Sequence, residues 1–117
     1  MRPILSAVAH IHSRGFIHRD LKPENIVIDH SQESGSLFSL KIIDFGLTAI
    51  NKACNAHFHK ITERCGTLIY MAPEQARQDH YGKPVDLWAC GTIMYTLLNK
   101  GAHPTYRRNV MSKEDFF

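Results

Sequence analysis

The sequence predicts a mainly helical α+β domain with one short β-hairpin. Residues 3–13 carry apolar side chains at helical spacing, with Pro3 in the first turn and Gly15 beyond the last, so they predict an amphipathic helix. Residues 85–98 are apolar on nearly every side, which predicts a second helix buried by other elements packed around it. Two short runs rich in β-branched residues lie between these segments and predict a pair of strands.

The predicted strands are residues 26–28 and 40–43, and residues 30–39 form a polar, glycine-containing connection between them. We expect a small hairpin that presents Asn25 at one end and Asp44 at the other. Both residues carry side-chain oxygens, so their placement bears directly on any cation site.

The remaining segments give weaker signals. Residues 48–69 have no clear hydrophobic period, and residues 73–78 could begin a short helix. Gly101 and Pro104 are expected to end the apolar helix, and a final short helix is expected near Ser112.

Composition excludes several classes of protein. A chain of 117 residues suffices for one domain with a core, and its net charge of +3 is dispersed. No basic stripe alternates with aromatic residues, so nucleic-acid binding is not expected. The three cysteines, an odd number without framework spacing, favour a reducing compartment. No apolar run has the length of a signal peptide core or a membrane span, so a soluble, intracellular, cytoplasmic protein is expected.

Four short motifs occur in order along the chain. They are H-R-D-L-K-P-E-N at 18–25, D-F-G at 44–46, A-P-E at 72–74 and D-x-W-x-x-G at 86–91. The first places a carboxylate, an amine and a carboxamide on one loop, and the second adds another carboxylate. Phosphoryl transfer needs a proton acceptor, oxygen ligands for Mg²⁺ and a cation near the moving phosphate. The chain therefore resembles the protein kinases, whose catalytic-loop and D-F-G motifs follow in this order.

The resemblance implies transfer of the ATP γ-phosphoryl group to serine or threonine hydroxyls of a protein substrate. Asp20 would accept the hydroxyl proton and orient the hydroxyl, and Lys22 would offset charge at the γ-phosphate. Asn25 and Asp44 would hold Mg²⁺, which prefers oxygen ligands. The string L-K-P-E-N indicates serine/threonine rather than tyrosine specificity. The alternatives are a turn-capping Asp20, an exposed Lys22 and a hydrogen-bonded structural pair of Asn25 and Asp44.

Five further residues have structural roles by the same resemblance. His18 would pack against the Phe45 ring as part of the core rather than act as a base, and Asp86 would anchor the catalytic loop from below. Gly46 would permit backbone angles that a side chain resists. Glu74 of A-P-E would pair with an arginine that lies beyond residue 117.

Four residues are candidates for regulation. Arg19 precedes the catalytic aspartate and in kinases often pairs with a phosphate on the activation segment. Thr67 matches the family threonine that hydrogen-bonds the catalytic aspartate and lysine. Many kinases carry a phosphorylated threonine four residues earlier, where this chain has Glu63, with Thr62 beside it. The hypothesis is that Glu63 partly substitutes for that phosphate by pairing with Arg19; the alternative is a solvated glutamate.

The resemblance covers only part of a kinase domain. No G-x-G-x-x-G segment and no V-A-I-K-like strand precede the catalytic loop, so residues 1–117 are expected to be a partial domain, roughly the middle third, without the small lobe needed for activity. A truncated gene model or truncated copy is expected. The isolated chain would expose apolar surface, have marginal stability and show negligible kinase activity. The loop insert, the C-G-T segment at 65–67 and the string I-M-Y-T-L-L-N-K-G-A-H-P at 93–104 favour the calcium/calmodulin-dependent-like group.

Two other hypotheses compete with the catalytic one. The chain could be a catalytically inactive interaction module derived from a kinase, or a nonfunctional relic. A zinc site is a further alternative, since Cys54, His57, His59 and Cys65 are possible ligands. Their spacing matches no common zinc finger, and chance enrichment in a chain with eight histidines accounts for it better.

Overall fold

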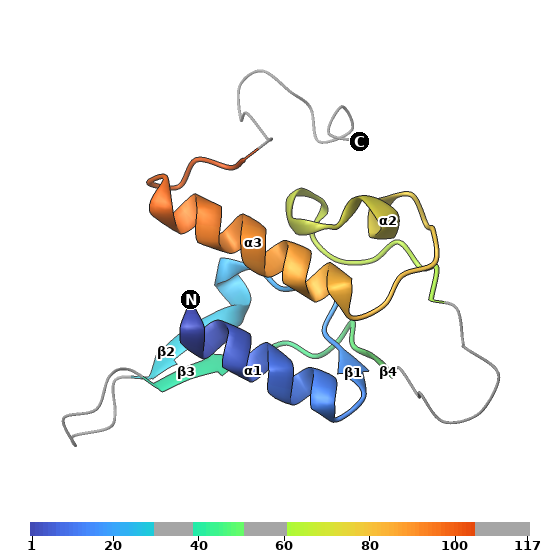
Figure 1. Ribbon diagram of the computed structural model, residues 1–117, viewed down its shortest axis with the longest axis horizontal. Helices are drawn as coiled ribbons and strands as arrows, with labels where there is room; N and C mark the ends of the chain where they lie inside the picture. Colours follow the sequence, from blue (N-terminus) through green and yellow to red (C-terminus); the bar gives the residue numbers. More distant parts are fainter. Residues whose placement is uncertain (30–38, 51–60, 105–117) are drawn as a thin grey trace.

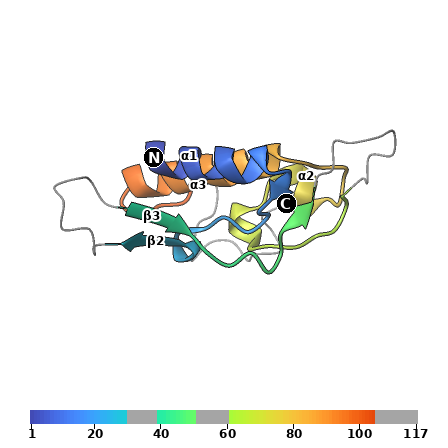
Figure 2. The same cartoon turned by 90° about the horizontal axis from the view of Figure 1, so that it is seen from below.

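The computed structural model describes residues 1–29, 39–50 and 61–104. Within them, helices α1 (Arg2–Ser13) and α3 (Pro84–Leu98) lie side by side and run in opposite directions (Figure 1). Seen from below, the two helices form one layer, and strands β2 (Ile26–Asp29) and β3 (Ser39–Ile42) lie along one side of it (Figure 2). The described part is therefore a small α+β unit.

Helix α1 is amphipathic, as its spacing predicts. It buries Ile4, Val8 and Ile11, which recur every three to four residues and so share one face. Its N-terminal turn contains a proline. This costs nothing, because the first backbone amides of a helix have no hydrogen-bond acceptor within the helix. Gly15 takes a φ of 79° just after the helix, in the left-handed region that glycine adopts without strain. The predicted helix at 3–13 is confirmed to within one residue.

The predicted hairpin is also confirmed. Strands β2 and β3 pair antiparallel, with Ile26 opposite Ile42, so β3 begins and ends one residue before its expected bounds. The backbone amide of Ile43 still donates to the carbonyl of Asn25 at 2.9 Å and extends the ladder by one bond. Because the strands are antiparallel, the two ends of this chain segment meet at the same edge of the sheet.

A second strand pair joins β1 (Phe16–Ile17) and β4 (Ala49–Ile50), again antiparallel. Nothing in the sequence predicts it, because two-residue strands are too short to show a period. The pair ties the start of the H-R-D-L-K-P-E-N loop to the segment that follows D-F-G. Local motifs thus become neighbours through contacts that lie outside the motifs themselves.

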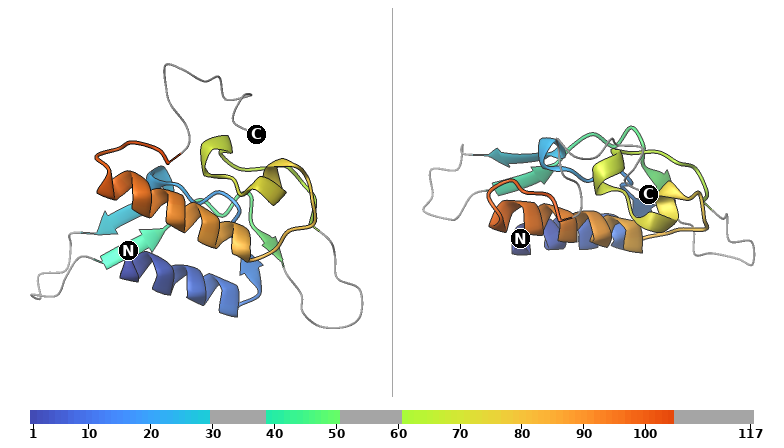
Figure 3. Two further views of the ribbon diagram at one scale, coloured as in Figure 1. Left: turned by 45° about the horizontal axis from the view of Figure 1, so that its top comes forward. Right: turned by 90° about the horizontal axis from the view of Figure 1, so that it is seen from above.

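Short helical turns complete the described fold. They are the 3₁₀ turns η1 (Pro23–Asn25) and η2 (Leu68–Tyr70) and the four-residue helix α2 (Pro73–Ala76). Helix α2 begins where the sequence predicts and ends two residues before the expected bound. The segment with η2 and α2 lies on the opposite side of α3 from α1 (Figures 1 and 3).

The expectation that α3 is buried on all sides is wrong. One face is buried through Val85, Asp86, Ala89, Cys90, Thr92 and Ile93. The other carries large exposed side chains, namely Leu87, Trp88, Met94, Tyr95, Leu97 and Leu98, which are 44–75% exposed. The physical reason is that the described elements cover only one side of the helix. The further helix expected near Ser112 lies outside the described residues.

The core joins both helices to the loops between them. Its larger cluster contains Ile4, Val8, Leu21, Tyr70, Ala89, Cys90 and Ile93, and a smaller one contains Ile17, Ala72 and Val85. Leu21 and Tyr70 bring the H-R-D-L-K-P-E-N loop and η2 into this core, so packing positions the four motifs. No helix in the described ranges is both long and apolar enough to cross a membrane.

Candidate active site

Asp86 anchors the loop that carries the first motif. Its carboxylate is 1% exposed and accepts hydrogen bonds from the backbone amides of His18 and Arg19, each at 2.9 Å. The Nε2 of His12 lies 2.7 Å from the same carboxylate and donates the third bond. A buried carboxylate is tolerated only when such donors surround it. The start of α3 therefore fixes the backbone directly before Asp20, where Arg19 has a left-handed φ of 69°.

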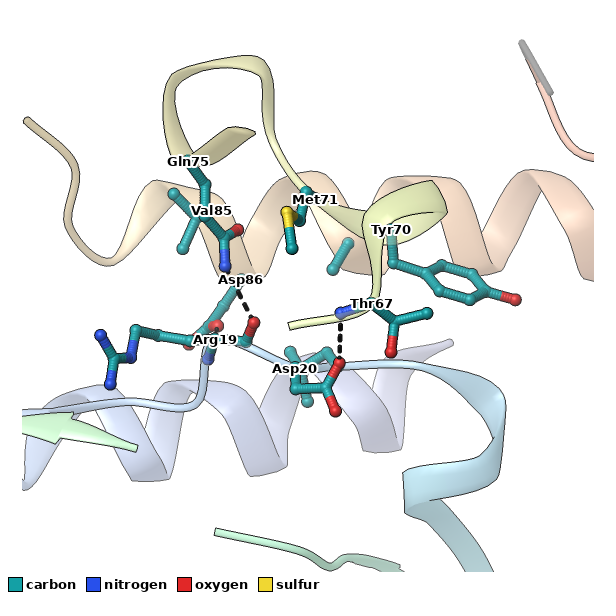
Figure 4. Close-up of a pocket in the computed structure, with 10 residues that line it drawn as sticks. Arg19, Asp20, Thr67, Tyr70, Met71, Gln75, Val85 and Asp86 are labelled. Atoms are coloured by element: carbon teal, nitrogen blue, oxygen red, sulfur yellow. Dashed lines mark hydrogen bonds between the residues drawn. The ribbon is translucent and has the colours of Figure 1, made fainter. Parts of the chain in front are cut away.

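Asp20 lies at the centre of a short hydrogen-bonded cluster. One carboxylate oxygen accepts the backbone amide of Thr67 at 2.7 Å, and the other accepts the Lys22 ammonium at 2.9 Å. The Lys22 ammonium also donates to the Thr67 hydroxyl at 2.9 Å. Figure 4 shows Asp20 and Thr67 facing each other across the junction of the loop with the segment before η2. The carboxylate is thus oriented from both sides before any substrate arrives.

Asn25 and Asp44 supply oxygen atoms at one edge of the β2–β3 hairpin. Asn25 is 5% exposed, and its amide nitrogen donates to the Asp20 carbonyl at 2.9 Å, so its amide oxygen is the atom that a hard cation would take. Asp44 is exposed, with a carboxylate oxygen 3.3 Å from the Gly46 amide. This donor set of a carboxylate and an amide oxygen fits Mg²⁺, which keeps several waters when bound.

The His18 ring packs against the Phe45 ring edge to face, with centroids 5.1 Å apart. His18 is fully buried; its Nδ1 accepts the Asp20 amide at 3.3 Å and its Nε2 donates to the Ile43 carbonyl at 3.1 Å. Both ring nitrogens are therefore occupied, as in a core histidine. Gly46 differs from expectation, because the left-handed backbone near it, φ 63°, belongs to Asp44.

Arg19 joins three parts of the chain. Its guanidinium donates to the Glu63 carboxylate at 2.9 Å, to the Tyr81 phenol oxygen at 3.3 Å and to the carbonyl of Leu47. Burial alone would lower the pKa of Arg19, but hydrogen bonds to Tyr81 and Glu63 outweigh it and raise that pKa. Arg19 therefore stays charged. Thr62 is half-buried beside Glu63.

Gly66 brings the segment before η2 into backbone contact with the loop. Its φ is 107°, and a Cβ at this position would lie 2.4 Å from the Arg19 carbonyl oxygen. Real Cβ atoms do not approach backbone oxygen that closely, so only glycine fits here. This close approach delivers the next residue, Thr67, to Asp20.

Three residues of the site have no counterpart in the motif analysis. Gln75 is 2% exposed, and its amide donates to the Arg19 carbonyl at 2.9 Å (Figure 4). The same amide nitrogen donates to the Cys65 carbonyl at 2.7 Å. Tyr81 holds Arg19 and Glu63, and His12 holds Asp86. For His12 the sequence offers one signal, which is its position next to the apolar face of the predicted helix. Gln75 and Tyr81 give no signal, because their contacts are long-range.

Two expectations concern residues outside the described ranges. The Glu74 carboxylate forms no ion pair among the described residues, and its pairing with an arginine beyond residue 117 stays a prediction. Of the four possible zinc ligands, Cys54, His57 and His59 lie outside the described ranges. Within those ranges, no group of three or more His, Cys, Asp or Glu side chains could hold a metal ion.

Comparison with known proteins agrees with this geometry. The family model of the protein kinase domain matches residues 1–115, and the chain belongs to that family. Its homologues are serine/threonine kinases of the calcium/calmodulin-dependent group.

Three relatives illustrate the match. A calcium/calmodulin-dependent protein kinase, cmkB, of Emericella nidulans is 46% identical over 84% of this chain and 23% of its own length. The type I calcium/calmodulin-dependent kinase of Schizosaccharomyces pombe is 43% identical over 85% of the chain and 28% of its own length. The liver/testis phosphorylase b kinase gamma catalytic chain of Mus musculus is 41% identical over 92% and 25%. The chain spans about a quarter of the length of these relatives.

Proposed function

We propose that residues 1–117 form the middle of the large lobe of a serine/threonine protein kinase, which transfers the ATP γ-phosphoryl group to protein hydroxyls. The observation that carries this proposal is the cluster of Asp20, Lys22 and Thr67. It joins a carboxylate, a cation and a hydroxyl from two distant segments within 2.9 Å contacts. Relatives that cover the same residues are named as protein kinases, which supports the reaction class.

In this mechanism Asp20 orients the acceptor hydroxyl and takes its proton as the new O–P bond forms, while the bond between the γ-phosphorus and the β–γ bridging oxygen breaks and ADP leaves. Its carboxylate is buried between Lys22 and Thr67, so little reorganisation precedes the reaction. Lys22 offsets negative charge at the transferred phosphoryl group. Because Lys22 contacts Asp20 before the substrate binds, its ammonium would have to shift toward the phosphate as the complex forms.

Asn25 and Asp44 would hold Mg²⁺. When bound there, Mg²⁺ would supply positive charge against the negative charge of the ATP phosphates. In the chain itself, the hairpin ladder keeps the two ligands at one edge, and the Asn25 amide stays fixed by the Asp20 carbonyl. The His18–Phe45 contact steadies the residue next to Asp44 from its buried side.

The test uses the gene product that carries this sequence, purified in full and assayed for Mg²⁺-dependent transfer from ATP to serine- and threonine-containing peptides. Asp20→Asn is expected to lower kcat by about 100-fold or more, the usual size of a lost acid–base group. Asp79→Asn, which neutralises an exposed carboxylate after α2, is the matched control. Equal activity of Asp20→Asn and the unsubstituted protein would overturn the assignment.

A second candidate function is an interaction module without catalysis, and the exposed apolar face of α3 favours it. The two candidate functions predict different sizes for the protein that the cell makes. An immunoblot of source cells with an antibody against residues 29–41 separates them. A single band at the size of 117 residues supports the interaction module, and a much larger band supports the kinase.

A further inference from the structure

Tyr81 contacts the segment 61–65 from the connection between α2 and α3. Its backbone amide donates to the Ile61 carbonyl at 3.1 Å in an isolated antiparallel bridge. Its phenol O–H donates to the Glu63 carbonyl at 2.6 Å and lies 3.8 Å from the Cys65 sulfur. Three alternate residues of one segment therefore meet a single tyrosine.

The same phenol also reaches the catalytic loop. Its oxygen accepts the Arg19 guanidinium at 3.3 Å, so one atom is bonded to both the loop and segment 61–65. Burial raises the pKa of Tyr81 to about 12, although the bond from Arg19 opposes the shift. The phenol therefore keeps its proton, and with it the bond to Glu63, throughout the neutral range.

The ion pair of Arg19 with Glu63 is a weaker link than this backbone bond. The Glu63 side chain is 75% exposed, so water and salt screen its charge. The bond from Tyr81 goes to the Glu63 carbonyl and does not depend on that charge. Tyr81 is also half-buried and packs against the smaller core cluster, which limits its own freedom.

We propose that Tyr81 is a positioning residue for phosphoryl transfer, acting through Thr67 on Asp20. Tyr81 pins residues 61–65 to Arg19, Gln75 holds the Cys65 carbonyl, and the contact of Gly66 then sets the Thr67 amide on the Asp20 carboxylate. The inference rests on the proposed function, because it names what keeps the same site in order. Tyr81 itself touches neither the candidate metal ligands nor Lys22.

The first measurement is tryptic cleavage after Arg64, an exposed residue inside the pinned segment, in the full gene product. Tyr81→Phe keeps the ring and removes the phenol oxygen. This substitution is expected to raise the cleavage rate at Arg64 at least fivefold. The rate is measured by mass spectrometry of the fragments. Tyr95→Phe, on the exposed face of α3, is the matched control and is expected to leave the rate unchanged. An Arg64→Gln background identifies the cleavage.

The second measurement is the kinetics of the same variants. Tyr81→Phe is expected to lower kcat about tenfold while KM for ATP stays within twofold, whereas general loss of folding would reduce the active fraction and the melting temperature. An unchanged cleavage rate, or an unchanged kcat with faster cleavage, overturns the role of Tyr81. Absence of phosphoryl transfer by the unsubstituted protein overturns the proposed function instead, and cleavage at Arg64 still reports on the contacts of Tyr81.

Discussion

The Asp20 carboxylate and the Thr67 backbone amide lie 2.7 Å apart, although 47 positions separate them in the chain. A charge-assisted bond of this kind is shorter and stronger than one between neutral groups. The orientation of Asp20 therefore depends on the order of the segment before η2. Conversely, that segment loses a partner whenever Asp20 is neutralised.

Glu63→Gln is expected to lower the phosphotransferase activity of the full gene product by at most about fivefold, because an exposed ion pair contributes about 1 kcal/mol or less. The loss should shrink at high salt, which already screens the Arg19–Glu63 pair. The measurement is kcat/KM at low and high ionic strength, with Asp79→Asn as the control for removing one exposed carboxylate. Unchanged activity at low salt would sink the hypothesis that Glu63 substitutes for a phosphate.

Gly66→Ala is expected to destabilise the chain by about 3 kcal/mol, from a backbone clash added to left-handed strain. Gly101 has a φ of 90° with open space around it, so Gly101→Ala isolates the strain alone. Gly91 is exposed in α3 with nothing near a Cβ, and Gly91→Ala should stabilise by up to about 1 kcal/mol. Urea unfolding ranks the three. If the free energy of unfolding of Gly66→Ala were no lower than that of Gly101→Ala, the predicted clash would be contradicted.

Cys90 is expected to resist alkylation in the folded state, because burial and the nearby Asp86 charge raise the pKa of its thiol to about 11. Iodoacetamide at pH 8 should modify Cys65, which is half-buried, and leave Cys90 intact until urea unfolds the chain. The experiment is done in a Cys54→Ser background, so that Cys65 and Cys90 are the two thiols of residues 1–117 that can react. Modification of Cys90 at the rate of Cys65 would be the opposite result.

The same shift predicts a loss of stability at alkaline pH. The folded state retains the Cys90 proton up to about pH 11, whereas an unfolded thiol loses it near 9.0. This contribution to stability is thus complete below pH 9 and disappears as the pH rises to 11. The urea midpoint should fall across that window by less in Cys90→Ala than in the unsubstituted chain.

Polar substitutions on the exposed face of α3 are expected to reduce self-association without unfolding the chain. Leu87→Ser and Leu98→Ser remove side chains that are 53% and 75% exposed. Sedimentation velocity should show less aggregate, and circular dichroism an unchanged helix content. Ile93→Ser is the contrast, since Ile93 is 1% exposed and its loss should cost about 3 kcal/mol or more. If both Leu variants aggregated as much as the unsubstituted chain, the exposed face of α3 would not be the surface through which the chain self-associates.

Local patterns were sufficient to predict the elements that have a regular apolar spacing or a residue that terminates a helix or strand. Helix α1 follows from its apolar spacing and the glycine after it, and the hairpin follows from two β-branched runs. Two of the four motifs named Asp20, Lys22, Asn25 and Asp44, which the fold brings to neighbouring segments. Their catalytic and metal-binding roles stay predictions.

Tertiary contacts account for what the sequence could not predict. The two-residue strands β1 and β4 exist only as a pair, and Gln75 and Tyr81 act through partners 10 to 62 positions away. The expected burial of α3 was wrong because apolar composition states what a helix can bury and not what is present to cover it. The left-handed φ of 63° lies at Asp44 and not at Gly46, and no local sequence pattern predicts this.

The hairpin ladder has a practical consequence for work on this protein. The spacing between Asn25 and Asp44 is set by the paired backbones of β2 and β3 and the bond from Ile43 to Asn25, and not by the length of chain between the strands. An epitope tag or a fluorophore attachment site inserted in the chain between the two strands is therefore expected to leave the ladder intact. A label there reports on the protein while leaving Asn25 and Asp44 where the ladder holds them.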